Sequence, residues 1–428
     1  MDYRKDIQTL TTAGGRVAAS FLSGMWVCLL ALAFLTGCGK RDTVEPAVGI
    51  DSPERTWVRV LLFGNLDQGT VAAPAGFTVD GVGNGVTADF SDTGRMHVGL
   101  ENGRIRIGEH RVCQEVILRP KDPYYVVLDG IGFRGNLHLR VNEDANSIQV
   151  INHVPLESYL LGVVGAEMYS YWEPETLKAQ TVAARTYCLA IQHRFGPARA
   201  WDVTRTQSNQ MYHGLAAENA RIRRAVLDTT GQILIAAGPD GREVIFPAYY
   251  SSSCGGHTEN SRAVFGDDWV NLPGAACSWC ERTSRRSDFF WGPVEYSMDE
   301  VSRRLIQRYS SLRRLERIID VNILETGALG RMTQVELIGE NGQRDRVRGE
   351  DFRLSLDPTG RRLRSTLVDL VKINGQIRFE NGRGFGHGVG LCQYGAQGLA
   401  RQGHHYDEIL SFYYPEARLV TIQTTAAQ

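Results

Sequence analysis

The stretch from Val154 to Ala190 reads VPLESYLLGVVGAEMYSYWEPETLKAQTVAARTYCLA, and it predicts two consecutive helices separated by a short turn. Pro155 suits the first position of the first helix. Glu157 follows in the first turn, where the positive end of the helix dipole favours a carboxylate. Pro174 suits the start of the second helix in the same way.

The first predicted helix carries a carboxylate on its apolar face. Leu156, Leu160 and Val163 recur at intervals of four and three, and Glu167 follows four residues later. At about 100° per residue, Glu167 lies about 20° around the axis from Leu156. Burial raises the pKa of a carboxyl group, and a carboxyl that keeps its proton near neutral pH suits a general acid for a glycosidic oxygen. The alternative is a helix-end Glu that reaches solvent or pairs with an Arg.

The second predicted helix has an apolar stripe and a clear stop. The stripe consists of Leu177, Thr181, Ala184, Cys188 and Ile191. Gly196-Pro197 ends the helix. Lys178, Gln180 and Arg185 lie off the stripe, and we assign them to substrate binding.

Four motifs in this order resemble the SpoIID/LytB family of bacterial cell-wall proteins. The first is LGVVGAEM followed by LKAQTVAARTY, and the others are SNQMYHG at 208–214, AYYSSSCGGHTENS at 248–261 and GRGFGHGVGLCQYGAQG at 382–398. Together they cover roughly residues 150–415. In sporulation members, the Glu of the A-E-M triplet is the proposed acid of a lytic transglycosylase, and here that residue is Glu167. Two positions depart from the pattern: Tyr169 stands where many relatives have Pro, and Cys392 where they often have Ser.

The resemblance implies an α+β fold in which an antiparallel β-rich domain precedes a mixed catalytic domain with two central helices lining a groove. It also implies an enzyme that cleaves peptidoglycan glycan strands between N-acetylmuramic acid and N-acetylglucosamine and leaves a 1,6-anhydro end. Tyr212 is assigned to substrate binding. The alternative function is that of the LytB-type relatives, which are glycan-binding modifiers that enhance a separate cell-wall amidase.

The last motif has glycine at every second position from Gly382 to Gly390, which predicts a strand with one face free of side chains. Such a face lets another backbone or a ligand approach closely. The family resemblance makes this segment a groove wall, so we assign His387, Gln393 and Tyr394 to substrate contact. The alternative for His387 is a structural hydrogen bond.

The start of the chain has the features of a bacterial lipoprotein. Arg4, Lys5 and Arg16 precede an apolar run at about 21–35, which is short for a transmembrane helix and typical of a signal peptide. Leu35-Thr36-Gly37-Cys38 resembles a lipobox, in which Cys38 becomes lipidated and anchors the protein to the membrane. An uncleaved anchor helix is the alternative. Either way we expect the folded part to work outside the cytoplasm, facing the periplasm or cell wall.

We expect the chain to comprise a signal peptide at 1–37, a polar tether at 38–55, a β-rich region at 56–150 and a catalytic domain at 151–420. Short alternating apolar runs such as WVRVLLFG and LHLRVN indicate antiparallel strands in the β-rich region. With 47 basic and 48 acidic residues the formal charge is −1, so no electrostatic argument favours nucleic acid as a partner.

Three cysteines and a histidine have the spacing of a closed zinc site. Cys254, His257, Cys277 and Cys280 form C-x2-H-x19-C-x2-C, two short chelating pairs separated by a loop within the segment 254–280. With four protein ligands the site would be structural, with one zinc per chain. The alternative is a disulfide between Cys277 and Cys280, because an extracytoplasmic C-x-x-C is often oxidised.

Overall fold

The computed structural model describes residues 57–82, 87–91, 94–143, 146–238 and 241–422. The expected signal peptide, the lipobox with Cys38 and the tether lie outside these ranges. Within them, no helix has the length and apolar character needed to cross a bilayer.

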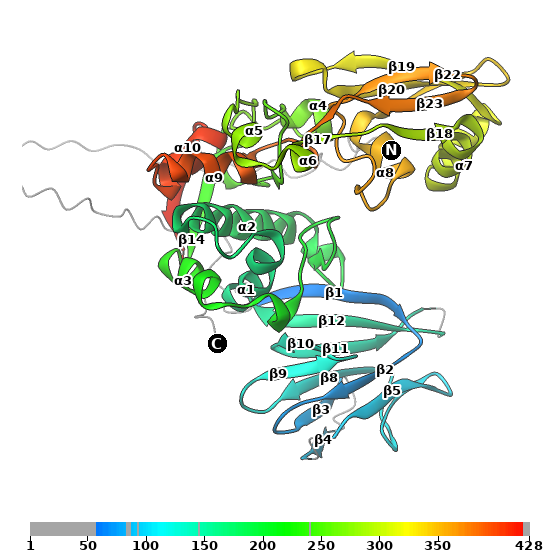
Figure 1. The fold of residues 1–428 in the computed structure, drawn as a ribbon. Helices are drawn as coiled ribbons and strands as arrows, with labels where there is room; N and C mark the ends of the chain where they lie inside the picture. The colour runs from blue at the N-terminus through cyan, green and yellow to red at the C-terminus, as the bar shows by residue number, and fades with distance from the viewer. Residues whose placement is uncertain (1–56, 83–86, 92–93, 144–145, 239–240, 423–428) are drawn as a thin grey trace, which may run out of the picture. The chain divides into compact units, whose positions relative to one another are not determined.

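Residues 57–155 form the expected antiparallel strands, arranged in two sheets (Figure 1). Over the described ranges, the first sheet has the order β13-β1-β12-β11-β8-β3-β4 and the second has the order β10-β9-β2-β5-β6-β7. The first sheet comprises β1 (Trp57–Leu66), β3 (Phe77–Gly81), β4 (Thr87–Phe90), β8 (Glu115–Pro120), β11 (Asn136–Val141), β12 (Ile148–Pro155) and β13 (Val203–Thr204). The second comprises β2 (Gln68–Ala72), β5 (Met96–Glu101), β6 (Arg104–Ile107), β7 (His110–Arg111), β9 (Tyr125–Leu128) and β10 (Ile131–Arg134).

Side chains in these strands alternate between the interior and the surface, as a half-buried sheet requires. In β1, for example, Val58, Val60 and Leu62 are buried and their neighbours are more exposed. β12 pairs with both β1 and β11 and then leads directly into the first helix. It therefore runs across the boundary at 150 that the sequence suggested.

The two helices predicted from the sequence are present as α1 (Leu156–Glu167) and α2 (Pro174–Phe195). Pro155 ends β12 and is the N-cap of α1, with an extended backbone at φ −56° and ψ 139°. The helix therefore begins at Leu156, one residue later than predicted. Every residue from Leu156 to Val164 is buried, so α1 has no solvent-facing side along most of its length. The reason is that β1, β12, α2 and α3 (Ala220–Asp228) all contact it.

A second apolar core lies on another face of α2, where Ala179, Val182 and Ala183 contribute to it. The elements around it come mainly from the later part of the chain. They are β14 (Gln232–Ala237), β15 (Glu243–Ile245), β16 (Tyr250–Ser251), α4 (Ser261–Phe265), α5 (Trp279–Thr283), α6 (Arg286–Phe289), β25 (Leu391–Cys392), α9 (Gln393–Arg401), α10 (Tyr406–Tyr413) and β26 (Arg418–Thr421).

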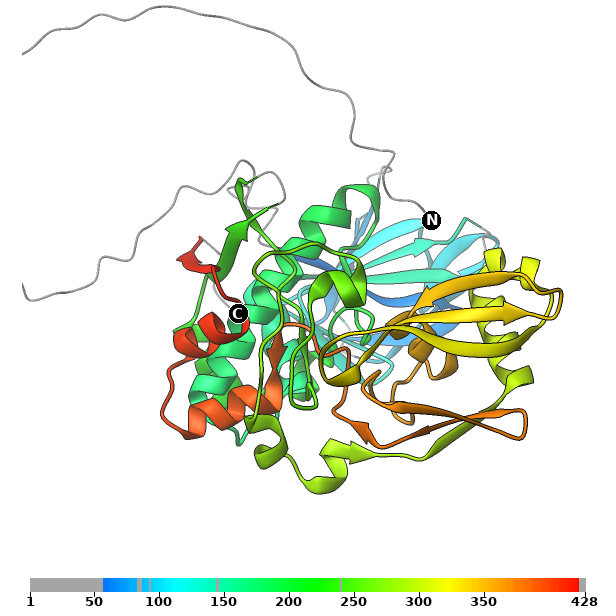
Figure 2. The same ribbon diagram turned by 90° about the horizontal axis from the view of Figure 1, so that it is seen from above.

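Residues 290–383 include a third apolar core that the sequence analysis did not separate from the catalytic domain. Figure 2 shows its sheets in yellow and orange. The elements are β17 (Phe290–Trp291), β18 (Val294–Ser297), α7 (Met298–Arg308), β19 (Ile318–Thr326), β20 (Met332–Gly339), β21 (Arg344–Arg348), α8 (Gly349–Leu356), β22 (Asp369–Ile373), β23 (Gln376–Glu380) and β24 (Gly382–Arg383).

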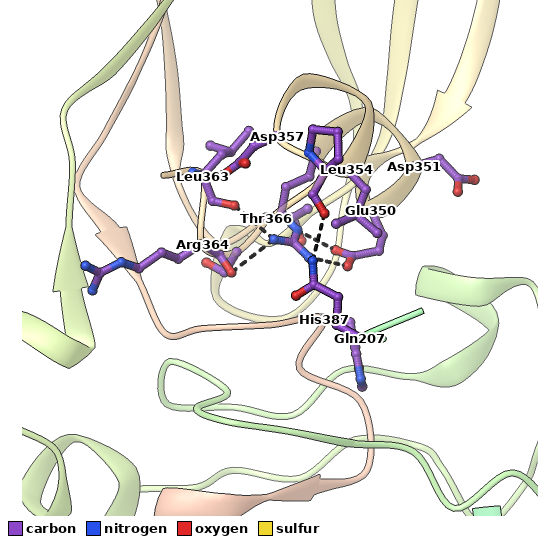
Figure 3. Close-up of polar contacts among 12 residues, drawn as sticks. Gln207, Glu350, Asp351, Leu354, Asp357, Leu363, Arg364, Thr366 and His387 are labelled. Carbon is purple, nitrogen blue, oxygen red and sulfur yellow. Dashed lines mark hydrogen bonds and ion pairs between the residues drawn. The ribbon is translucent and has the colours of Figure 1, made fainter. Parts of the chain in front are cut away.

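A buried ion pair lies within α8 of this third unit (Figure 3). The Arg353 guanidinium donates to both oxygens of Glu350, at 2.9 and 2.6 Å, and to the carbonyl of Leu363 at 2.9 Å. The Gln207 side chain, from the segment that follows β13, donates to the carbonyl of Pro358 at 2.7 Å. That bond ties the third unit to the loop that carries the SNQMYHG motif.

The expectation of a strand from Gly382 to Gly390 is wrong. Strand geometry is confined to β24 and β25, and the glycines between them have φ values of 69° to 100°. A Cβ on Gly384 would lie 2.6 Å from the carbonyl oxygen of Ser253, and one on Gly390 would lie 2.0 Å from that of Tyr249. Glycine recurs there because the backbone is left-handed and packs against another backbone.

Candidate functional site

Glu167 is the last residue of α1, and it is partly exposed although the helix before it is buried. Its Oε1 accepts a hydrogen bond from the backbone N–H of Met211 at 2.8 Å. The side chain of Gln393, the first residue of α9, is also hydrogen-bonded to the carboxyl group. Three segments far apart in sequence therefore meet at this carboxyl.

Desolvation raises the pKa of Glu167 from 4.5 to about 6, while its bonds with Met211 and Gln393 act in the opposite direction. The position at the C-terminal end of α1 also disfavours the ionised form, because the helix dipole is negative there. With a pKa of about 6, roughly a tenth of the molecules carry the proton at pH 7. The raised pKa expected from the sequence is confirmed.

Gln210 precedes Met211, the hydrogen-bond donor to Glu167, and is held by hydrogen bonds of its own side chain. Gln210 donates to the hydroxyl of Tyr250 at 2.9 Å and to the carbonyl of Ala184 at 3.1 Å, and it accepts from the hydroxyl of Tyr159 at 3.1 Å. Tyr250 is close enough for the charge of Glu167 to raise the pKa of its hydroxyl, although burial is the larger cause. The sequence analysis assigned no role to Met211 or Tyr250, although both lie in motifs that it quoted.

Two residues assigned to substrate binding lie in the protein interior instead. Arg185 has no exposed surface, and its guanidinium pairs with both oxygens of Glu157 at 2.9 and 2.6 Å. Tyr212 is 1% exposed, and its hydroxyl donates to the side chain of Asn152 at 2.9 Å. Both assignments are corrected, because these side chains have their partners inside the fold and cannot reach a ligand.

The other two assignments on α2 divide between surface and interior. Lys178 pairs with Glu175 at 2.9 Å and lies 3.8 Å from Asp228, on a part of α2 that solvent reaches. Gln180 is fully buried, and its side-chain oxygen accepts from the Gln393 side chain at 3.4 Å. Gln180 thus supports the residue that touches Glu167 and does not face a ligand itself.

His387 is held by the backbone through both ring nitrogens. Nε2 donates to the carbonyl of Tyr250 at 2.9 Å, and Nδ1 accepts from the N–H of Val389 at 3.0 Å. Desolvation lowers its pKa to about 4, so the ring is neutral at pH 7. Figure 3 shows His387 in the same region as Glu350, whose negative charge raises the pKa of His387 and opposes part of the effect of desolvation. The structural alternative given for His387 is the one that this geometry supports.

Four cysteine side chains converge beside the start of α9. The Sγ atoms of Cys254, Cys277, Cys280 and Cys392 all lie within 4.8 Å of one another, and all four residues are buried. This differs from the predicted ligand set, because Cys392 takes the place expected for His257. Nδ1 of His257 instead lies 2.5 Å from the carbonyl oxygen of Thr258. The expected His257 ligand is therefore corrected to Cys392.

The geometry of these cysteines fits a tetrahedral metal. Metal–sulfur bonds of about 2.3 Å place tetrahedral sulfur atoms roughly 3.8 Å apart, and the Sγ atoms of Cys254 and Cys280 are 3.6 Å apart. Sγ of Cys392 accepts from the N–H of Cys254 at 3.3 Å and from that of Gly395 at 3.4 Å. Such N–H donors orient a thiolate ligand. The cluster could therefore hold a metal such as zinc, and the described cysteines are all free thiols.

Comparisons with known proteins show which family the sequence resembles. Residues 144–235 match the family model of the stage II sporulation protein SpoIID, and residues 281–390 match a domain of unknown function, DUF8618, which coincides with the third core. The chain is 30% identical over 311 residues to an uncharacterized protein of Brachyspira hyodysenteriae, covering 72% of this chain and 78% of that protein.

Two named relatives come from Bacillus subtilis. Stage II sporulation protein D is 29% identical over 286 residues, covering 62% of this chain and 74% of the relative. The amidase enhancer is 27% identical over 391 residues, covering 79% of this chain but only 52% of the relative. The chain belongs to the SpoIID family, and that membership implies cell-wall remodelling outside the cytoplasm.

Proposed function

We propose that this protein is a lytic transglycosylase that cleaves peptidoglycan glycan strands, with Glu167 as its acid and base. The observation that carries the proposal is that Glu167, a partly exposed residue at the end of α1, has a carboxyl group whose desolvation raises its pKa to about 6. Its neutral form would protonate the glycosidic oxygen between N-acetylmuramic acid and N-acetylglucosamine. The resulting carboxylate would then accept a proton from the muramic C6 hydroxyl as that oxygen closes a 1,6-anhydro ring on C1.

One carboxyl group is enough for this reaction. Ordinary glycosidases use two carboxyl groups, the second serving as nucleophile or as the base that activates water. In a lytic transglycosylase the substrate's own hydroxyl is the nucleophile. The Met211 N–H assists the acid by donating a hydrogen bond to Oε1 of Glu167. A proton on the neutral acid is therefore directed to the other oxygen, because an N–H donor needs an unprotonated acceptor.

We also propose one structural zinc ion per chain, held by the thiolates of Cys254, Cys277, Cys280 and Cys392. Four protein ligands would leave no position for a catalytic water, so its contribution would be to folding. The site would fasten the Cys254 loop and the start of α5 to Cys392, which caps α9 immediately before Gln393. The metal would thus stabilise the position of Gln393 against Glu167.

The expected anchoring remains a proposal. Lipidation of Cys38 would hold the protein at the membrane surface, with 38–55 as a tether and 56–428 facing the periplasm or cell wall. Cys38→Ala should release or mislocalise the protein without unfolding it. Unchanged membrane retention and unchanged precursor processing in that variant would exclude the lipoprotein assignment.

A second candidate function follows from the similarity to the amidase enhancer. In that case the protein would bind glycan strands and raise the activity of a separate cell-wall amidase, without cleaving glycosidic bonds. The two functions differ in their products. Purified protein should be incubated with intact and with peptide-stripped glycan, and the products examined for 1,6-anhydro ends. Firm binding without such ends, together with a faster added amidase, would favour the enhancer function.

A further inference from the structure

Two tyrosine rings stand in solvent immediately after the proposed acid. Tyr169 is 50% exposed and Tyr171 is 67% exposed, and they follow Glu167 by two and four residues. Large aromatic side chains in solvent contribute little to folding, because their apolar area remains hydrated. Their exposure within four residues of Glu167 points to a role in binding.

The segment that carries these rings is held in place by its own backbone contacts. The guanidinium of Arg221, on α3, donates to the carbonyl of Ser170 at 2.8 Å and to that of Trp172 at 2.7 Å. The N–H of Trp172 donates to the carbonyl of Tyr169 at 3.0 Å, which closes a turn. Trp172 is itself only 4% exposed and anchors the end of the segment in the core. The tyrosines are therefore presented from an ordered turn.

The exposed rings continue through Trp172 to Tyr394, the residue after Gln393. The ring centroid of Tyr169 lies 5.4 Å from that of Tyr171 and 5.4 Å from that of Trp172. The ring centroids of Trp172 and Tyr394 are 5.0 Å apart. Tyr394 is half-buried and follows Gln393, which is hydrogen-bonded to Glu167. We call the solvent-accessible rings of Tyr169, Tyr171 and Tyr394 the aromatic surface, and the buried Trp172 packs against it.

We infer that the aromatic surface is a sugar-binding subsite, on which Tyr169 and Tyr171 stack against one N-acetylhexosamine ring of the glycan strand next to the bond that Glu167 cleaves. A pyranose ring presents C–H groups on its faces and hydroxyl groups at its rim. The negative face of an aromatic ring attracts such C–H groups, and tyrosine hydroxyls hydrogen-bond at the rim. Tyrosine also offers a large contact area at a small cost in conformational entropy.

This inference rests on the proposed function, since it takes the glycan strand as the ligand. It goes further by assigning a subsite to Tyr169 and Tyr171, two residues that the sequence analysis left without a role.

The test is a binding measurement in which no cleavage takes place. Full-length protein with Glu167→Gln is titrated with peptide-stripped glycan strands, and affinity is followed by calorimetry. Tyr171→Ala and the double variant Tyr169→Ala/Tyr171→Ala are made in the same background. We expect affinity to fall about 3- to 10-fold for the single change and about 10- to 100-fold for the double. Tyr171→Phe, which keeps the ring, should retain most of the affinity.

The matched control is Leu324→Ala, which removes a side chain that is 46% exposed on β19, in the third unit. Its affinity should equal that of the Glu167→Gln background. Unchanged affinity in the double tyrosine variant would overturn the subsite while leaving the proposed reaction intact. No glycan binding by the Glu167→Gln protein would overturn the subsite as well. Weaker binding in the tyrosine variants, with no anhydro products from the parent, would support the subsite and refute the proposed reaction.

Discussion

Replacing Glu167 with Gln should stabilise the protein at neutral pH and have little effect at acidic pH. The folded-state pKa of about 6 exceeds the ordinary 4.5, so the folded protein holds this proton more tightly than the unfolded chain does. As pH rises from about 4 to 7, the unfolded chain ionises first and the parent loses stability. The Gln side chain never ionises, and its oxygen can still accept from the Met211 N–H.

The magnitude follows from the shift in pKa. A difference of about 1.5 between 6 and 4.5 corresponds to about 2 kcal/mol of unfolding free energy. The Gln variant should therefore gain up to about 2 kcal/mol on the parent between pH 4 and pH 7, with most of the change between pH 4.5 and 6.

The assay is urea unfolding of residues 56–428 at several pH values between 4 and 8, for the parent and the variant. Glu325→Gln, at an exposed position on β19, serves as the matched control and should show no such pH-dependent gain. If the stability difference between parent and Glu167→Gln is the same at pH 4 and pH 7, the carboxyl does not have a raised pKa. A Gln variant that becomes relatively less stable toward pH 7 would show that the pKa is lowered.

Three other predictions concern the reaction, the cysteine cluster and the core. Cleavage should fall about tenfold per pH unit above pH 6, because the neutral form of Glu167 becomes scarce; a flat rate from pH 6 to pH 8 would contradict this. Cys392→Ser should lower zinc content and melting temperature while His257→Ala preserves the metal, as elemental analysis would show; the opposite pattern would restore the original ligand set. Glu157→Gln should cost about 3–5 kcal/mol in urea unfolding, because Arg185 keeps its buried charge without a charged partner, and a cost below about 1 kcal/mol would refute that pairing.

Local sequence pattern was sufficient to predict the elements up to the end of α2. The alternating runs before Pro155 became strands, and the two apolar segments of the opening stretch became α1 and α2. The unusual position of Glu167 on an apolar face was also informative, because desolvation is the largest cause of its raised pKa. Helix and strand patterns depend on residues that lie close together in the sequence, so a single sequence is enough to reveal them.

Features that depend on distant contacts could not be predicted from spacing. Arg185 and Tyr212 looked available for a ligand, but Glu157 and Asn152 bind them in the core. Residue spacing favoured His257 as a metal ligand because it lies three positions from Cys254. The fourth thiol comes instead from Cys392, which the close packing of the glycine-rich segment brings to the cluster.

The third core shows a related limit of pattern analysis. Nothing in the sequence periodicity of its strands and of helix α7 indicated that they enclose a separate apolar interior. Register and packing decide which strands pair with each other. The sequence pattern of a strand does not show which of two apolar cores it belongs to.

The measurement that decides the proposed function is product analysis with matched variants. Peptide-stripped glycan is digested with the parent, Glu167→Gln and Glu325→Gln proteins, and the ends are identified by mass spectrometry. The parent and Glu325→Gln should release fragments with 1,6-anhydro ends at equal rates. Glu167→Gln should be slower by at least the roughly 100- to 10,000-fold that general acid–base catalysis typically contributes. Anhydro-ended fragments released by Glu167→Gln at the parental rate would contradict the role of Glu167.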